Sequence, residues 1–205
     1  MTDLILIAGL PGTGKTSFAR YLSAKMKIPM ISKDLIKEQL FDTAGFKNRQ
    51  EKVNLGTAAM AIMYHIADLH LEIGLPIILE NNFENVSKPG LLKLIEKHNC
   101  NPVMVKFHTE MSVLAERFRI RDQSPQRHRG HVVNTQYPEV SNNLQKEIYL
   151  DNAEFNWKKY YSAMHERGMD TFSIGCPEIP ADSTDFSRLD YEKIFIEILA
   201  KIIDK

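Results

Sequence analysis

The chain has 205 residues with 26 basic and 26 acidic side chains, so its formal net charge is zero. A balanced charge argues against the broad basic surface of a nucleic-acid-binding protein, but not against a local basic patch. No apolar stretch approaches the roughly 20 residues of a membrane span, and Asp3 interrupts the short apolar run that a signal peptide would need. Two cysteines without metal-ligand spacing are typical of a reduced, cytoplasmic protein, which is our expectation here.

Apolar strand patterns alternate with helical patterns through the first 121 residues. The expected strands are 4–8, 29–32, 76–80 and 102–107, and the expected helices are 16–26, 33–40, 51–73, 91–98 and 111–121. Such alternation is typical of a parallel sheet covered by helices. The length suits one α/β domain, so we expect a single domain over residues 1–205.

The second half of the chain is less regular. Residues 122–136 are polar and basic, which predicts a surface loop or lid. Helices are expected at 144–150, 157–166 and 190–203. Two segments compete for the fifth strand, 171–174 and 178–181. The second is favoured because a short loop and the final helix follow it, and because an edge strand tolerates Pro180.

The segment 9–16 (GLPGTGKT) matches the pattern GxxxxGK[ST] without a gap. Its glycines let the backbone turn its N–H groups inward, and the helix that follows adds its positive dipole end. Lys15 can reach the β- and γ-phosphates of a nucleotide, and the Thr16 hydroxyl can bind Mg²⁺. The apolar strand before the loop and the helix after it are the context that this motif requires. The sequence thus predicts a nucleoside triphosphate site made by Gly9, Gly12, Thr13, Gly14, Lys15, Thr16 and Ser17.

A phosphate-binding loop alone does not distinguish a small kinase from a switch GTPase or a motor ATPase. The NKxD element of guanine-specific switches does not occur. The sequence DTAG at 42–45 follows a helical pattern instead of a strand, which predicts a helix end capped by Gly45. No strand ends in the acidic pair of a motor ATPase, and Glu80 closes the third strand instead.

Polar residues follow the second and third strands at the carboxyl edge of the expected sheet, where ligands of α/β proteins bind. Asp34 could accept the proton of an attacking hydroxyl, hold Mg²⁺ through water, or cap its helix. Lys37, one turn further, could attract an anionic substrate, with a solvated lysine as the alternative. Glu80 could orient Mg²⁺-bound water or the substrate. Asn81 and Asn82 could bind hydroxyl groups, or form a turn.

A group of basic residues lies on the fifth expected helix and in the lid. Arg117 and Arg121 are four residues apart and share one helix face, whereas Arg119 points elsewhere. The lid adds Arg127, Arg129 and His131. Arginines that close on a transferring phosphoryl group are what phosphoryl transfer needs beyond the P-loop. The alternatives are a contact with RNA phosphates and a solvated face.

Several of these motifs together resemble one family of small P-loop kinases. The motifs are GLPGTGKT, ISKDLIKEQL, PIILENNF, an RxxxR helix and the lid sequence RHRGH. The family is the group of predicted kinases that includes polynucleotide 5′-kinase, zeta toxin and chloramphenicol phosphotransferase. The resemblance implies the P-loop NTPase fold, an α/β/α sandwich whose five parallel strands run in the order 2-3-1-4-5.

The same resemblance implies roles for single residues. Lys15 and Thr16 would serve ATP and Mg²⁺, and Asp34 would be the base. Arg117 would lie against adenine, and Arg121 would reach the phosphates. The loop that touches the base would be made by Asp182, Ser183 and Thr184.

The chain departs from the polynucleotide kinase pattern at two positions. Lys37 stands where that pattern has arginine and lacks its bidentate fork, and Glu80 stands where the pattern has aspartate. A nucleic-acid 5′-end is therefore a less fitting substrate. The sequence predicts an ATP-dependent phosphotransferase acting on a hydroxyl of a small molecule, with Lys15, Asp34 and Arg121 as catalytic residues. The alternatives are a polynucleotide 5′-hydroxyl kinase and a nucleotide-binding switch without catalysis. Asp34 and Glu80 both stay open as the base.

Overall fold

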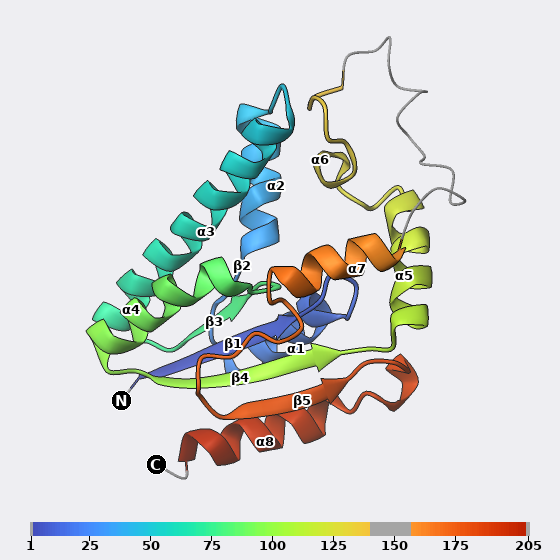
Figure 1. Cartoon of the computed structure of the whole chain (residues 1–205). Coiled ribbons are helices and arrows are strands. Elements are labelled where there is room, and N and C mark those ends of the chain that lie inside the picture. The colour runs from blue at the N-terminus through green and yellow to red at the C-terminus, as the bar shows by residue number, and fades with distance from the viewer. Residues whose placement is uncertain (1, 140–156, 204–205) are drawn as a thin grey trace.

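The computed structural model describes residues 2–139 and 157–203. Its sheet has five strands, all parallel, in the order β2-β3-β1-β4-β5 (Figure 1). The strands are β1 (Asp3–Gly9), β2 (Met30–Ser32), β3 (Ile77–Glu80), β4 (Asn101–His108) and β5 (Glu178–Asp182). This is the P-loop fold and the strand order that the resemblance implies, so both expectations are confirmed.

Strand β1 is buried on both faces because helices cover the sheet from both sides. Leu4 and Leu6 pack into a cluster with apolar residues of α3 (Arg49–Glu72) and α4 (Lys88–His98). Ile5 and Ile7 point the other way and pack with α1 (Lys15–Met26) and α8 (Tyr191–Ile203). The continuous apolar run of β1 is therefore the pattern of a central parallel strand, and the three layers follow from it.

The fifth strand is the segment that the sequence favoured. β5 lies at the sheet edge, where Pro180 stands opposite Lys106 of β4 without interrupting a central ladder. The competing segment 171–174 is not a strand, and the Phe172 ring there stacks on Phe83. The helix expected at 144–150 lies outside the described residues.

The remaining helices rise above the carboxyl edge of the sheet. They are α2 (Lys33–Ala44), α5 (Met111–Gln123), the short α6 (Arg129–Val132) and α7 (Trp157–Glu166). Together, α2 and α3 form an arm that projects from the sheet, and α6 lies beside the arm near its tip (Figure 1). Gly45 caps α2 with a positive φ of 64°, as the DTAG sequence predicts. No helix in the described ranges is both long and apolar enough to cross a membrane.

The lid segment (residues 122–136) is not the free surface loop that its polar composition suggests. It includes α6, and Val133 is buried in a cluster with Phe41 of α2 and Phe46. Just beyond the segment, the backbones of Phe46 and Tyr137 exchange two hydrogen bonds of 2.8 Å. These apolar and backbone contacts, which are distant in the sequence, hold the segment against the arm.

Polar contacts complete this docking. The ammonium of Lys52, buried on α3, donates to the carbonyl oxygens of His131 (2.8 Å) and Val133 and to Oδ1 of Asn134 (3.2 Å). The imidazole of His131 lies 3.0 Å from a carboxylate oxygen of Glu38 on α2. The backbone carbonyls of His131 and Val133, which are shielded from water, thereby gain a hydrogen-bond donor. The lid and the arm form one packed unit.

We expect Phe41→Ala to lower the free energy of unfolding by about 3–5 kcal/mol, because the ring is fully buried between the arm and the lid segment. Urea unfolding followed by circular dichroism measures the change. Leu92→Ala, at an exposed apolar position on α4, is the control and should change stability by less than about 0.5 kcal/mol. Equal losses for the two variants would contradict the docking described here.

Candidate active site

The P-loop has backbone conformations that glycine alone adopts easily. Gly9 ends β1 with a φ of 136°, and an added Cβ would lie 2.3 Å from the carbonyl oxygen of Phe107 on β4. Gly12 and Gly14 have φ angles of 85° and 87°, and Gly14 is the N-cap of α1. The loop therefore turns directly from the central strand into a helix N-terminus, which is the arrangement that binds phosphate groups.

Lys15 lies at the centre of the candidate site. Its side chain is buried, and its ammonium donates a 2.8 Å hydrogen bond to the carbonyl oxygen of Leu10 within the loop. Burial lowers the pKa of Lys15 to about 8, while the charges of Glu80 and Asp34 oppose this shift and Arg121 adds to it. The loop, β3, α2 and α5 thus bring four of the predicted site residues within electrostatic range of one another.

Glu80 and Thr16 form a buried polar group beside Lys15. Glu80 is 5 % exposed, and its carboxylate accepts hydrogen bonds from the Ser32 hydroxyl (2.5 Å) and from the Thr16 side chain. Burial raises the pKa of Glu80 although Lys15 and these hydrogen bonds oppose the rise. Ser32 is a site residue that the sequence analysis missed. Its role depends on the pairing of β2 with β3, which places Ser32 opposite Glu80 and which local sequence pattern does not give.

Asp34 lies in the first turn of α2, two residues beyond the N-cap Ser32, so it is not the helix cap. Its carboxylate accepts no hydrogen bond from the described residues. Burial acts to raise the pKa of Asp34, but the positive charges of His131, Lys37 and Lys15, together with Lys33, lower it overall. The site therefore presents an ionised carboxylate whose oxygens are available to a ligand.

The two arginines that share a face of α5 take different positions. The guanidinium of Arg117 stacks on Phe186 at 3.6 Å from the ring centroid and donates to the carbonyl oxygen of Thr184 (3.2 Å). The guanidinium of Arg121 lies over Phe118 and within electrostatic range of Lys15. Arg119 pairs with Glu116 on the exposed side of α5, as expected from its spacing.

The lid residues also separate into two groups. Arg127 and His131 lie within electrostatic range of Asp34. The guanidinium of Arg129 instead makes two hydrogen bonds, of 2.6 and 2.9 Å, with the carboxylate of Glu139.

Other predicted residues have structural partners or face away. Ser183 is fully buried and donates through its N–H and hydroxyl to the carbonyl of His108, both at 2.9 Å. Asn81 is buried, and its side-chain oxygen accepts from the N–H of Asn82 at 2.8 Å, which is the turn alternative. Ser17 is exposed. Asn82 is half-buried at the carboxyl end of β3.

A cleft of about 630 Å³ opens between the loop after β4 and the loop after β5. Phe186 follows this second loop and is 49 % exposed although it is a large aromatic residue. A Cβ added to Gly14 would lie 2.8 Å from the Phe186 ring, so the ring packs directly against the P-loop. The sequence analysis missed Phe186, and its only sequence signal was its place after the Asp182–Thr184 loop. The cleft between the loops after β4 and β5 is lined by His108, Thr109, Glu110, Asp182, Thr184, Asp185 and Arg188.

The oxygen donors of the site fit a magnesium ion that is held partly by a nucleotide. Thr16 offers a hydroxyl, and Glu80 and Asp34 offer carboxylates, which are the ligand types that Mg²⁺ prefers. The described residues contain no cluster of three or more side chains of the types that could hold a metal ion by themselves. Mg²⁺ binds to many enzymes in this way, with one or two protein oxygens and with phosphates and water as the other ligands.

Comparison with known proteins bears on this geometry. A family model described as an AAA domain matches residues 4–139, which include the P-loop, the arm and the lid segment. The chain belongs to the AAA domain family. Among curated proteins, no sequence matches this AAA domain protein.

Solved structures share the fold of this AAA domain. A "putative kinase" from Chloroflexus aurantiacus J-10-fl superposes with a TM-score of 0.77 at 23% identity, covering 98% of both chains. A sugar kinase from Janibacter sp. HTCC2649 gives 0.54 at 12% identity, over 98% of this chain and 95% of that one. Shikimate kinase from Bacteroides thetaiotaomicron gives 0.50 at 15% identity, over 99% of both chains. The chain therefore has the P-loop fold of small kinases, and the resemblance predicted from its motifs is confirmed.

We expect Glu80→Gln to lower the pKa of Lys15 below its value of about 8, because the Glu80 charge favours the protonated ammonium. A pH titration of the Lys15 side-chain resonances by nuclear magnetic resonance measures this shift. Glu116→Gln, which removes an exposed carboxylate from α5, is the control and should leave the Lys15 pKa unchanged. An unchanged or raised pKa in Glu80→Gln would contradict the arrangement of the buried group.

Proposed function

We propose that the protein is an ATP-dependent phosphotransferase that moves the γ-phosphate of ATP to a hydroxyl group of a small molecule. The observation that carries the proposal is Asp34, a half-buried carboxylate kept ionised by surrounding cations and accepting no hydrogen bond from the described residues. It lies within electrostatic range of Lys15 in the phosphate-binding loop. A carboxylate base beside a phosphate site suits transfer to a hydroxyl.

On this proposal, the P-loop from Gly9 to Thr16 binds the phosphates of ATP. The Lys15 ammonium exchanges its contact with the Leu10 carbonyl for the β- and γ-phosphate oxygens. Arg117, held in a plane by Phe186, stacks against the adenine base.

Asp34 accepts the proton of the acceptor hydroxyl as the oxygen attacks the γ-phosphate. Glu80 is hydrogen-bonded to Ser32 and Thr16 and buried too deeply to serve as the base, so we assign it to orienting water in the metal shell. Thr16 and a carboxylate would hold Mg²⁺, which neutralises charge on the β- and γ-phosphates when bound. We assign Lys37 and Asn82, which are both half-buried, to contacts with the acceptor.

Arg121 and Arg127 act on the transferring group from the lid side. Arg121 is within electrostatic range of Lys15, and Arg127 is within range of both Arg121 and Asp34. Their charges stabilise the negative oxygens of the γ-phosphoryl group in the transition state. The docked lid segment keeps water from competing with the acceptor hydroxyl.

The experiment that tests the proposal is a measurement of ADP formation by the purified protein with Mg²⁺ and ATP. Pools of sugars, sugar acids, sugar phosphates, nucleosides, antibiotics and 5′-hydroxyl oligonucleotides serve as acceptors. We expect one small-molecule pool to raise turnover well above the rate with ATP alone. Stimulation by the oligonucleotide pool alone would favour a polynucleotide kinase, and no stimulation by any pool would overturn the proposal.

Asp34→Asn should reduce kcat by about 10²–10⁴-fold, because the amide cannot accept the hydroxyl proton. The affinity for ATP should change little, since the phosphates are bound by the P-loop. Steady-state kinetics and calorimetric titration with a non-hydrolysable ATP analogue measure the two quantities. A kcat within a few-fold of the wild-type value would rule out Asp34 as the base.

Arg121→Ala should reduce kcat by about 10²–10³-fold, the usual effect of removing one group that stabilises transition-state charge. Arg119→Ala is a matched control on the same helix, since Arg119 pairs with Glu116 on the exposed side. Its kcat should stay within about threefold of the wild-type value, because an exposed ion pair contributes little. Similar losses in both variants would show that α5 is sensitive to any arginine replacement, and would contradict the role of Arg121.

A further inference from the structure

Two lysines on the arm interact with the Asp34 charge but form no ion pair within the described part of the chain. Lys33 and Lys37 are four residues apart on α2, so they share one helix face with Asp34 close by. Neither ammonium is in an ion pair with any described residue. Like charges at this spacing destabilise a helix, so the arrangement has a cost in stability.

Lys37 is the more confined of the two. Its side chain is half-buried between α2 and α3, with the ammonium 5.2 Å from the centroid of the Phe41 ring. On the other side, a Cβ added to Gly56 of α3 would lie 3.4 Å from the ammonium nitrogen. Burial and the charge of Lys33 lower the pKa of Lys37 to about 8, although Asp34 opposes the shift. A cation in such a place is costly unless an anion compensates it.

The other cations near Lys37 already have partners. Arg49 donates to the side-chain oxygen of Asn134 at 2.9 Å. Arg167 pairs through two nitrogens with the carboxylate of Glu84. Both still add positive potential at Lys37. The lysines of α2 therefore carry positive charge that the single carboxylate of Asp34 offsets only in part.

We propose that Lys37, with Lys33 beside it, binds a carboxylate or phosphate group of the acceptor. The acceptor is then a small molecule that carries an anionic group in addition to its reactive hydroxyl. Lys37 lies one helical turn beyond Asp34, a separation of about 5–6 Å between Cβ atoms, so the two groups of the acceptor lie a few bonds apart. This inference rests on the proposed function, because it uses Asp34 as the position of the hydroxyl.

The first test compares acceptors that differ only in the anionic group. The rates of ADP formation are measured for glycerol, glycerate and glycerol 3-phosphate, and for glucose, gluconate and glucose 6-phosphate, at one ionic strength. The best acceptor of the pool screen is measured beside its neutral analogue. We expect kcat/KM to be at least about tenfold higher for an acidic acceptor than for its neutral analogue, because a charge-assisted hydrogen bond contributes about that much. Comparison of the carboxylate with the phosphate compound then identifies which anion Lys37 binds.

A best acceptor without an anionic group would overturn this inference and leave the proposed function intact. Turnover that no acceptor raises would overturn the proposed function, and the inference with it. The two failures are therefore distinguishable.

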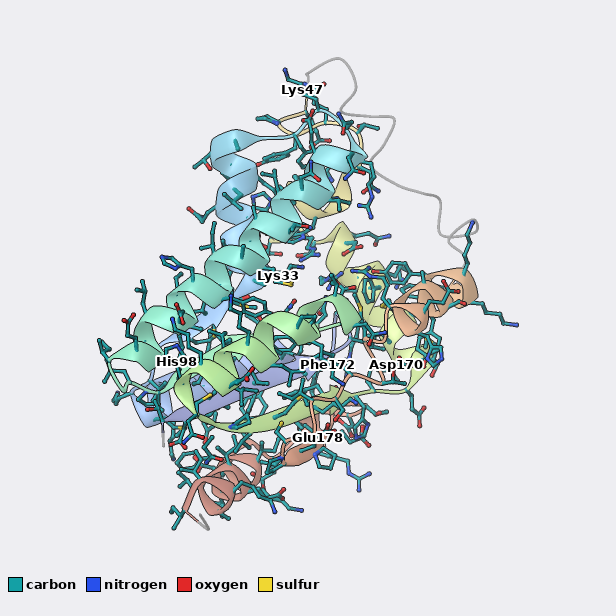
Figure 2. The ribbon with its side chains drawn as sticks, turned by 60° about the vertical axis from the view of Figure 1, so that its left-hand side comes forward. Lys33, Lys47, His98, Asp170, Phe172 and Glu178 are labelled. Carbon is teal, nitrogen blue, oxygen red and sulfur yellow. The ribbon has the colours of Figure 1, made fainter. Side chains whose placement is uncertain are left out.

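The second test removes the charge from the arm. Lys37→Met should raise KM for the acidic acceptor by about 10–100-fold, with kcat within about threefold of the wild-type value. Lys37→Arg should restore most of the affinity. The matched control is Lys47→Met, which removes an exposed lysine from the tip of the same arm, whereas Lys33 lies near its base (Figure 2). An unchanged KM in Lys37→Met, or the same rise in Lys47→Met, would overturn the inference.

Discussion

The burial of one ammonium group, that of Lys15, organises the carboxyl edge of the sheet. Strand β1 has helices on both faces and ends at a glycine packed against β4, and the lysine of the P-loop that follows it is buried, with an exposed fraction of 5 %. A cation in that position needs compensating charge. Glu80 at the end of β3 and Asp34 after β2 supply it, and they lie on the side of β1 that the strand order gives to β3 and β2. The phosphate site and the proposed base are thus parts of one electrostatic unit.

One face of α2 connects this electrostatic unit with the proposed acceptor site and with the lid segment. Asp34, Lys37, Glu38 and Phe41 are at positions i, i+3, i+4 and i+7, which share one side of a helix. Asp34 faces the P-loop lysine, Lys37 is confined against α3, Glu38 pairs with the imidazole of His131, and Phe41 packs against the lid cluster. In most surface helices, the residues at these four positions form an apolar stripe that packs against the core. Here it carries the groups that would surround an acceptor.

Local pattern was enough to predict the strands, the P-loop and most helix positions, because each depends on residues near one another in the sequence. The strand order came from the resemblance to small P-loop kinases. The docking of the lid segment could not be predicted in this way. Lys52 resembles any lysine of an amphipathic helix, and its three acceptors lie about 80 residues further along the chain. Phe186 resembles an ordinary loop aromatic until its ring is found over Gly14 and under Arg117. Ser32 required the pairing of β2 with β3.

The measurement that tests the central claim most directly is the fate of the γ-phosphate. With ATP labelled at that position, phosphorylated acceptor, inorganic phosphate and ADP are quantified in one reaction. If the protein is a phosphotransferase that excludes water from the reaction, we expect one phosphorylated acceptor for each ADP formed above background, with little inorganic phosphate. ADP that is matched by inorganic phosphate, at a rate that does not depend on the acceptor, would contradict the account and indicate a nucleotide-hydrolysing switch.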